Sequence, residues 1–149
     1  AAVALLAISL FTAYTLYANL EMFRVGAGLM AERFPLAAVK HLRERARIHR
    51  LYNAYNFGGY LIWERTPPEG VFVDGRAITA YPAAFLERFD AAYGNPAIFE
   101  SLAAEYEIDG VLMPTTSAKT RRLIAYLQAH PRFVLTHEDA VACVFERRD

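Results

Sequence analysis

The chain has one cysteine among 149 residues and no net charge. A disulfide needs two cysteines, so Cys143 alone excludes an internal disulfide and any zinc site built from several thiolates. Sixteen Lys and Arg residues balance sixteen Asp and Glu residues. Nucleic-acid-binding domains usually carry a basic excess, and its absence argues against nucleic acid as a partner. Hydrophobic residues make up 55% of the chain, which excludes a disordered tail.

The usual catalytic and metal-binding motifs are also missing. The sequence has no Walker phosphate loop, no Gly-x-Ser-x-Gly elbow and no His-Glu-x-x-His pair. Asp74-Gly75-Arg76 lacks the second aspartate of a paired-carboxylate motif. Cys143 lies among apolar residues of a strand-like segment, which predicts an inert core thiol. We therefore expect no catalytic residue, no metal and no cofactor in this segment.

Charge is absent from the first twenty residues, and Glu21 is the first charged residue. A helix of that length rises about 30 Å, the thickness of a bilayer's hydrocarbon core. Tyr14 and Tyr17 would lie near one membrane interface. We expect residues 1–23 to form a transmembrane helix. Because the chain starts with Ala rather than Met, we expect this helix to be the last span of a longer protein.

The next segment is basic. From Glu21 to Arg50 there are seven Lys and Arg residues and three Glu residues, which gives a net charge of +4. We expect residues 24–47 to be a juxtamembrane basic linker and an amphipathic helix, which starts near Pro35. The basic side chains could attract anionic lipid headgroups, although a solvated helix face accounts for them as well. Taken alone, this charge would favour a cytoplasmic location.

Residues 48–149 are predicted to form an α/β domain with a mixed sheet and a C-terminal β-hairpin. Short apolar runs predict strands, and apolar residues at helical spacing predict helices. Tyr55 to Gly59 is expected to be a loop, and Tyr60 to Trp63 a brief apolar turn or helix. The expected strands are Ile48–Ala54, Val71–Val73 and Gly110–Met113, followed by a hairpin of Arg132–Thr136 and Val141–Glu146 around His137-Glu138-Asp139. The expected helices start at Pro82, run from about Ala97 to Tyr106, and follow Ser117 as an N-cap up to His130-Pro131.

Polar and glycine residues follow three of the predicted strands. They are Tyr55, Asn56, Gly58 and Gly59 after the first strand, Asp74 and Arg76 after the second, and Thr115 after the third. The carboxyl ends of parallel strands share one crevice, so we expect these residues to form a ligand site. Each also has a structural explanation, because Gly and Asn suit turns and Asp74 could pair with Arg76 or cap a turn.

Two motifs resemble a known family. Tyr55-Asn56-Phe57-Gly58-Gly59-Tyr60-Leu61-Ile62-Trp63 and Val71-Phe72-Val73-Asp74-Gly75-Arg76 resemble the C-terminal soluble domain of bacterial multi-spanning membrane proteins, mostly uncharacterised, that are related to lipid-linked-sugar (C-type) glycosyltransferases. The resemblance runs from about Phe34 to Arg147. It implies upstream membrane helices in the bacterial inner membrane and a tail domain outside the cytoplasm. The related transferases use an acidic base in an early outer loop, which no position here matches.

The resemblance implies a membrane-tethered accessory domain that does no chemistry itself. Its expected partners are membrane lipid, the upstream transmembrane helices, and a polyprenyl-phosphate sugar or glycan acceptor. The basic Lys40–Arg50 stretch departs from the pattern of an exterior domain. Two other classes stay open: a structural or protein-interaction module that caps a membrane protein, and a soluble α/β enzyme with a buried N-terminal helix.

Overall fold

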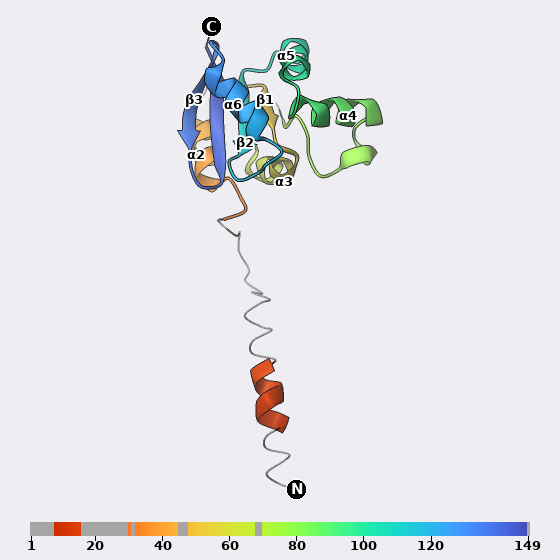
Figure 1. Ribbon diagram of the computed structural model, residues 1–149, viewed down its shortest axis with the longest axis vertical. Coiled ribbons are helices and arrows are strands. Elements are labelled where there is room, and N and C mark those ends of the chain that lie inside the picture. Colours follow the sequence, from red (N-terminus) through yellow and green to blue (C-terminus); the bar gives the residue numbers. More distant parts are fainter. Residues whose placement is uncertain (1–7, 16–29, 31, 45–47, 68–69, 149) are drawn as a thin grey trace.

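The computed structural model describes residues 8–15, 30, 32–44, 48–67 and 70–148 (Figure 1). Residues 8–15 are helical. The rest of the expected transmembrane segment at 1–23, and most of the linker before residue 32, lie outside the described residues. Within the described ranges, no helix combines the length and the apolar character that crossing a membrane requires.

Residues 48–148 contain an α/β arrangement with a four-stranded mixed sheet, as expected from the sequence. The sheet order is β1-β2-β4-β3; β1 and β2 run parallel, and the other neighbours run antiparallel. The predicted C-terminal hairpin is confirmed as β3 and β4. The strands are β1 (Leu51–Asn53), β2 (Gly110–Pro114), β3 (Phe133–Glu138) and β4 (Ala142–Arg147), and the helices are α2 (Leu36–Glu44), α3 (Tyr55–Glu64), α4 (Ala83–Ala92), α5 (Pro96–Glu105) and α6 (Arg121–Ala129), with a 3-10 turn η1 (Ala77–Thr79).

The helices pack around the sheet through apolar faces that the sequence pattern predicts. α2 buries Ala38, Val39 and Leu42 and packs against β3 and β4, while α6 buries Leu123 and Leu127. The predicted helices at α4 and α5 are confirmed, and Figure 1 shows them together on one side of the domain. Their burial removes apolar surface from water, which is the main stabilising contribution to such a core.

Tyr52 of β1 joins the α4–α5 pair to the sheet. Its side chain is fully buried, and its hydroxyl donates a hydrogen bond to the carbonyl of Phe89 at 3.2 Å. Its ring lies 5.3 Å from the ring of Phe89 and 5.4 Å from that of Phe99, centre to centre. These edge and tilted contacts are favourable for aromatic rings, so one residue of β1 positions both helices.

The predicted loop at Tyr55 to Gly59 is wrong, because α3 begins at Tyr55 and continues to Glu64. The expectation of a brief turn or helix at Tyr60 to Trp63 is confirmed as the second half of α3. Two glycines disfavour a helix by about 1 kcal/mol each, which explains the wrong prediction. The tertiary structure requires a glycine at position 58. A Cβ there would lie 2.1 Å from the carbonyl oxygen of Val73, so only glycine allows α3 to approach this segment.

The predicted strand at Val71 to Val73 is also wrong, because this segment joins no strand ladder. The side-chain amide of Asn53, the last residue of β1, takes the place of a neighbouring strand. Its Oδ1 accepts a hydrogen bond from the Phe72 backbone N–H at 2.9 Å, and its Nδ2 donates to the Val73 carbonyl at 2.8 Å. The Phe72 N–H and the Val73 carbonyl therefore have hydrogen-bond partners without strand pairing.

Two turn assignments differ from the sequence prediction. Thr120, and not Ser117, directly precedes α6; its hydroxyl donates to the carbonyl oxygens of Pro114 and Ser117. The hairpin turns after Glu138, because the Asp139 carboxylate accepts hydrogen bonds from the backbone N–H groups of Val141 and Ala142. Side-chain hydrogen bonds to loop backbone accompany both boundaries, and residue pattern alone does not locate them.

Candidate functional site

A groove of about 780 Å³ opens where the parallel strands β1 and β2 end. Tyr55 and Asn56, which follow β1, form one part of its lining. Ser117 and Lys119, which follow β2, form a second part, and α4 supplies much of the remaining wall. The carboxyl ends of parallel strands are the usual ligand position in an open α/β sheet. The groove is therefore the leading candidate for a binding site among the described residues.

The walls of the groove combine aromatic and polar groups. Phe89 and Tyr93 contribute buried aromatic rings, and Tyr55 contributes a ring that is 36% exposed. Lys119 pairs with the carboxylate of Asp90, and its Nζ lies 5.5 Å from the centre of the Tyr93 ring. This combination suits a ligand that has both apolar faces and hydrogen-bonding groups.

Ionisation of Tyr93 in the groove is suppressed. Burial raises the pKa of Tyr93, and the negative charge of Asp90 raises it further, while a hydrogen bond from the Tyr55 backbone acts in the opposite direction. The phenol of Tyr93 is therefore neutral at physiological pH. It contributes an apolar ring and a hydroxyl to the groove, and it contributes no charge.

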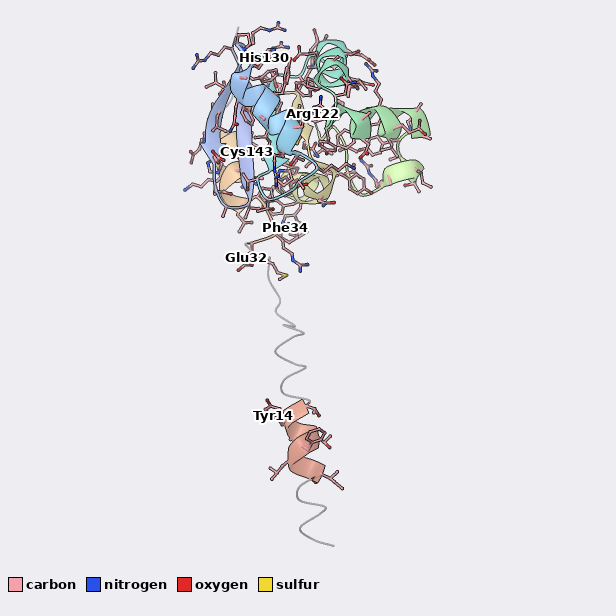
Figure 2. The ribbon with its side chains drawn as sticks, in the orientation of Figure 1. Tyr14, Glu32, Phe34, Arg122, His130 and Cys143 are labelled. Atoms are coloured by element: carbon pink, nitrogen blue, oxygen red, sulfur yellow. The ribbon has the colours of Figure 1, made fainter. Side chains whose placement is uncertain are left out.

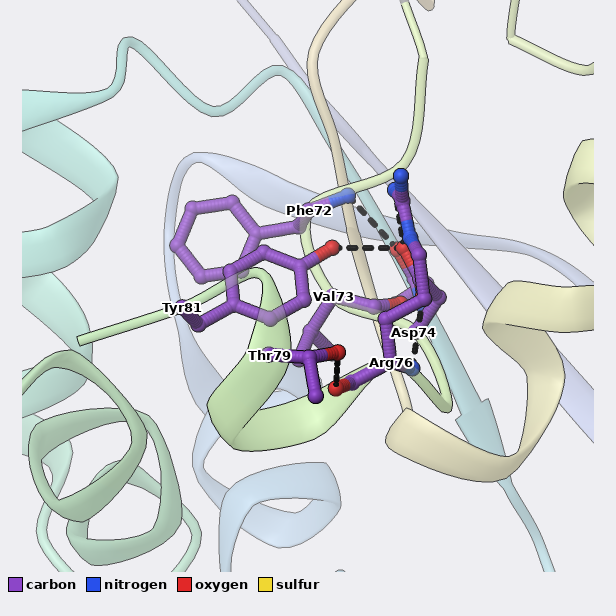
Figure 3. A network of polar contacts seen from close by, with 7 residues as sticks. Phe72, Val73, Asp74, Arg76, Thr79 and Tyr81 are labelled. Carbon is purple, nitrogen blue, oxygen red and sulfur yellow. Dashed lines mark hydrogen bonds and ion pairs between the residues drawn. The ribbon is translucent and has the colours of Figure 1, made fainter. Parts of the chain in front are cut away.

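Asp74 and Arg76 form a separate polar network beside the groove (Figure 3). Asp74 is 2% exposed, and its Oδ1 accepts from the backbone N–H and the Nε of Arg76, both at 2.9 Å. Its Oδ2 accepts from Arg76 Nη2 at 2.7 Å and from the Tyr81 hydroxyl at 2.6 Å. Both carboxylate oxygens are thus occupied by internal donors, in the two-pronged geometry typical of arginine–carboxylate pairs.

The network keeps Asp74 ionised. The hydrogen bond from the Arg76 side chain is the largest influence on the pKa of Asp74; together with Tyr81 and the Arg76 backbone it outweighs burial and holds the pKa well below its usual range. The same pairing raises the pKa of the Arg76 guanidinium. Asp74 is therefore an internal counter-ion, and Arg76 keeps a side chain that is 64% exposed.

The structure brings only some of the predicted site residues together. Tyr55 and Asn56 line the groove, but Gly58 is buried against the segment of Val73 and Asp74. Gly59 lies on the exposed side of α3 with open space where a Cβ would be. The roles predicted for these residues in ligand binding stay predictions.

The other predicted residues lie around the groove rather than in it. The Asp74 and Arg76 pair precedes Ala77, which does line the groove. Thr115 follows Pro114 of the lining, and its backbone N–H donates to the carbonyl of Val141 at 3.1 Å. Its hydroxyl oxygen is the buried side-chain polar atom that has no hydrogen-bond partner among the described residues. No described contact connects that oxygen to the groove.

The α4 side of the groove was missed from the sequence. Glu87 and Asp90 line it, although they lie on a helix that the sequence places away from any strand end. Their position depends on the contacts of Tyr52 with α4, which pattern does not reveal. Lys119 had a usable signal, because it follows β2 in the same loop as Ser117.

Comparisons of the chain with protein-family models, curated proteins and solved structures gave no match. The resemblance to the tail domains of glycosyltransferase-like membrane proteins accordingly stays an expectation from the sequence. The support for a role of the groove and of the Asp74 network is their own geometry and chemistry.

Proposed function

We propose that this chain is a membrane-tethered accessory domain of a glycosyltransferase-like integral membrane protein. In this proposal its groove binds a glycan acceptor or the headgroup of a polyprenyl-phosphate sugar, and the chain itself does no chemistry. The proposed location is the bacterial inner membrane, with residues 48–149 outside the cytoplasm.

The observation that carries the binding role is the convergence of the start of α3 and the loop after β2 on one groove. Tyr55 and Asn56 reach it from β1, and Ser117 and Lys119 reach it from β2. A sugar ring has CH-lined faces and a rim of hydroxyls, so it matches aromatic walls flanked by amide, hydroxyl and charged groups. Lys119 adds a cation that could also meet a phosphate, if its pairing with Asp90 is exchanged.

The tether rests on the sequence of the first twenty residues. They carry no charge, and the described part, residues 8–15, is helical. Thr12 donates its hydroxyl proton to the carbonyl of Ile8, and Thr15 donates to that of Thr12. Hydroxyls bonded back to the helix in this way lower the cost of placing them in lipid. The proposal assigns this segment to a transmembrane helix.

The test is a calorimetric titration of the full chain in nanodiscs with mannotetraose, chitotetraose and a short-chain prenyl-phosphate mannose. We expect at least one of these probes to bind. Asn56→Ala should weaken that binding by about tenfold, since a lost polar contact to a ligand is worth roughly 1–1.5 kcal/mol. Asn56 is exposed, so this change should leave the fold intact.

Gln128→Ala provides the matched control. Gln128 is an exposed amide side chain on α6 that does not line the groove, so its removal should leave binding unchanged. If none of the three probes binds, or if both variants weaken binding equally, the binding role is wrong. A stable protein partner recovered by crosslinking would then favour a structural module that caps a membrane protein.

A further inference from the structure

The outward side of α3 is apolar, which is unusual for a helix at a protein surface. Trp63 is 79% exposed and Ile62 is 47% exposed, and Gly59 lies on the same exposed side without a side chain. The one charged residue of α3, Glu64, is paired with Arg43. A helix that faces water normally carries charged residues on its outer side.

α6 of the same domain provides the contrast. It buries Leu123 and Leu127 and exposes Arg121, Arg122 and Gln128, the ordinary amphipathic pattern. Single exposed apolar residues need no explanation, but adjacent large ones on an otherwise uncharged helix face indicate a contact surface. We call the surface of Gly59, Ile62 and Trp63 the α3 face.

The α3 face lies close to the point where the chain enters the domain. Phe34, which leads into α2, packs its ring 5.4 Å from that of Tyr60 on α3. Figure 2 shows Glu32 and Phe34 at one end of the domain and His130 at the opposite end. Trp63 follows Tyr60 by three residues, so both lie on neighbouring parts of the helix surface. The chain therefore enters the domain at the end that carries the α3 face.

The charges beside this face favour an anionic surface. Arg65 follows Trp63 by two residues, and Arg33 precedes Phe34; both side chains are exposed. Glu32 is also exposed at this end and offsets one of them. Lys and Arg side chains next to a membrane attract anionic lipid headgroups, and tryptophan is enriched at the membrane–water interface.

We propose that the α3 face rests on the bilayer surface, with Trp63 and Ile62 inserted among the lipid headgroups. This inference rests on the proposed membrane tether, which would hold the entry end of the domain near the bilayer. Tyr55 and Asn56, at the other end of α3, line the groove. Contact through α3 places the groove beside the headgroup layer, so a ligand attached to a lipid would reach it without leaving the membrane.

Trp63 is the one tryptophan of the chain and is itself the reporter for the test. The full chain is reconstituted in vesicles of phosphatidylcholine and phosphatidylglycerol, and its fluorescence is measured with lipids brominated near the headgroups and with aqueous iodide. We expect the brominated lipids to quench Trp63 and the bilayer to protect it from iodide.

A control variant moves the reporter to the far end of the domain. Trp63→Phe combined with Ala129→Trp places it on an exposed position of α6 next to His130. Iodide should quench this tryptophan, and brominated lipids should not. Circular dichroism checks that both proteins have the same helix content. Equal lipid quenching of both reporters would overturn the inference.

Flotation of the vesicles separates the two proposals. A chain that fails to float with the vesicles contradicts the membrane tether, and the inference fails with it. A chain that floats while iodide still quenches Trp63 contradicts the contact of the α3 face alone. Protection from iodide without quenching by lipid would mean that protein covers the face, and it would also overturn the inference.

Discussion

The side-chain amide of Asn53 donates a hydrogen bond to the carbonyl oxygen of Val73 at 2.8 Å. The same amide group accepts from the N–H of Phe72 through its oxygen, so it acts as one residue of a missing strand. Asn53 is fully buried at the end of β1. The segment that leads to Asp74 is therefore hydrogen-bonded to the end of β1 through the Asn53 side chain.

Asn53→Ala is expected to destabilise the domain by about 2–3 kcal/mol, because it leaves the Phe72 N–H and the Val73 carbonyl without partners. Asn53→Asp should be similarly harmful, since a carboxylate can accept from Phe72 but cannot donate to Val73. The free energy of unfolding is measured by urea denaturation of the full chain in mild detergent. A loss below about 0.5 kcal/mol, the size expected for the surface control Asn56→Ala, would contradict this role.

The two glycines of α3 should respond to alanine in opposite directions. Gly58→Ala is expected to cost about 1–3 kcal/mol, because its Cβ would overlap the Val73 carbonyl and force the backbone apart. Gly59→Ala meets no atom within 4 Å and should stabilise the helix by about 0.5–1 kcal/mol. The same denaturation experiment measures both changes. Equal effects of the two substitutions would show that α3 does not approach the segment of Val73 and Asp74 as described.

The network around Asp74 predicts a pH-dependent stability difference. The folded-state pKa of Asp74 lies well below its ordinary value of 3.8, mainly because of the hydrogen bond from Arg76. A depressed carboxyl pKa stabilises the fold above the unfolded-state pKa, and this stabilisation is lost as the pH falls toward the folded-state value. Asp74→Asn should therefore lower the urea midpoint at neutral pH.

The gap between wild type and Asp74→Asn should narrow as the pH drops below about 4, where the unfolded chain takes up the proton. Tyr81→Phe removes one donor to Oδ2 and should show a smaller loss at neutral pH. The stability of wild type has to be compared with that of Asp74→Asn, because the pKa of Asp139 is also lowered. Asp139 therefore adds its own acid sensitivity to both proteins. A gap that stays constant from neutral to acid pH would exclude the ionised pair as its cause.

Cys143 should be unreactive in the folded chain. Its side chain is buried in β4, and burial, together with the charge of Glu138, raises the pKa of its thiol to about 11. The thiolate is the reactive species, so a neutral buried thiol is protected. Labelling by iodoacetamide at pH 8 should be negligible in native conditions and complete in urea. Rapid native labelling would place Cys143 at an accessible site.

Residue pattern was sufficient for most of the fold. The apolar run at β2, the helical spacing in α4 and α6, and the paired strand segments at the C-terminus predicted the mixed α/β arrangement. Burial of apolar residues at a fixed period is a local property, and it can be recognised without knowing the neighbours. The position of Asn56 and Ser117 near strand ends was likewise visible in the sequence.

Contacts between distant segments decided the parts of the fold and of the groove that the residue pattern did not predict. α3 contains two glycines, which predict a loop, yet the segment is a helix whose close approach to Val73 requires glycine at position 58. The apolar run of Val71 to Val73 predicts a strand, yet the side chain of Asn53 makes the hydrogen bonds that a neighbouring strand would make. Asp90 reached the groove through the packing of α4 on Tyr52. Hydrophobic periodicity is a local property, so the residue pattern predicted most of the buried positions and most of the element order. What each segment packs against depends on shape and on hydrogen bonding between residues far apart in the chain, and the folded arrangement settled it.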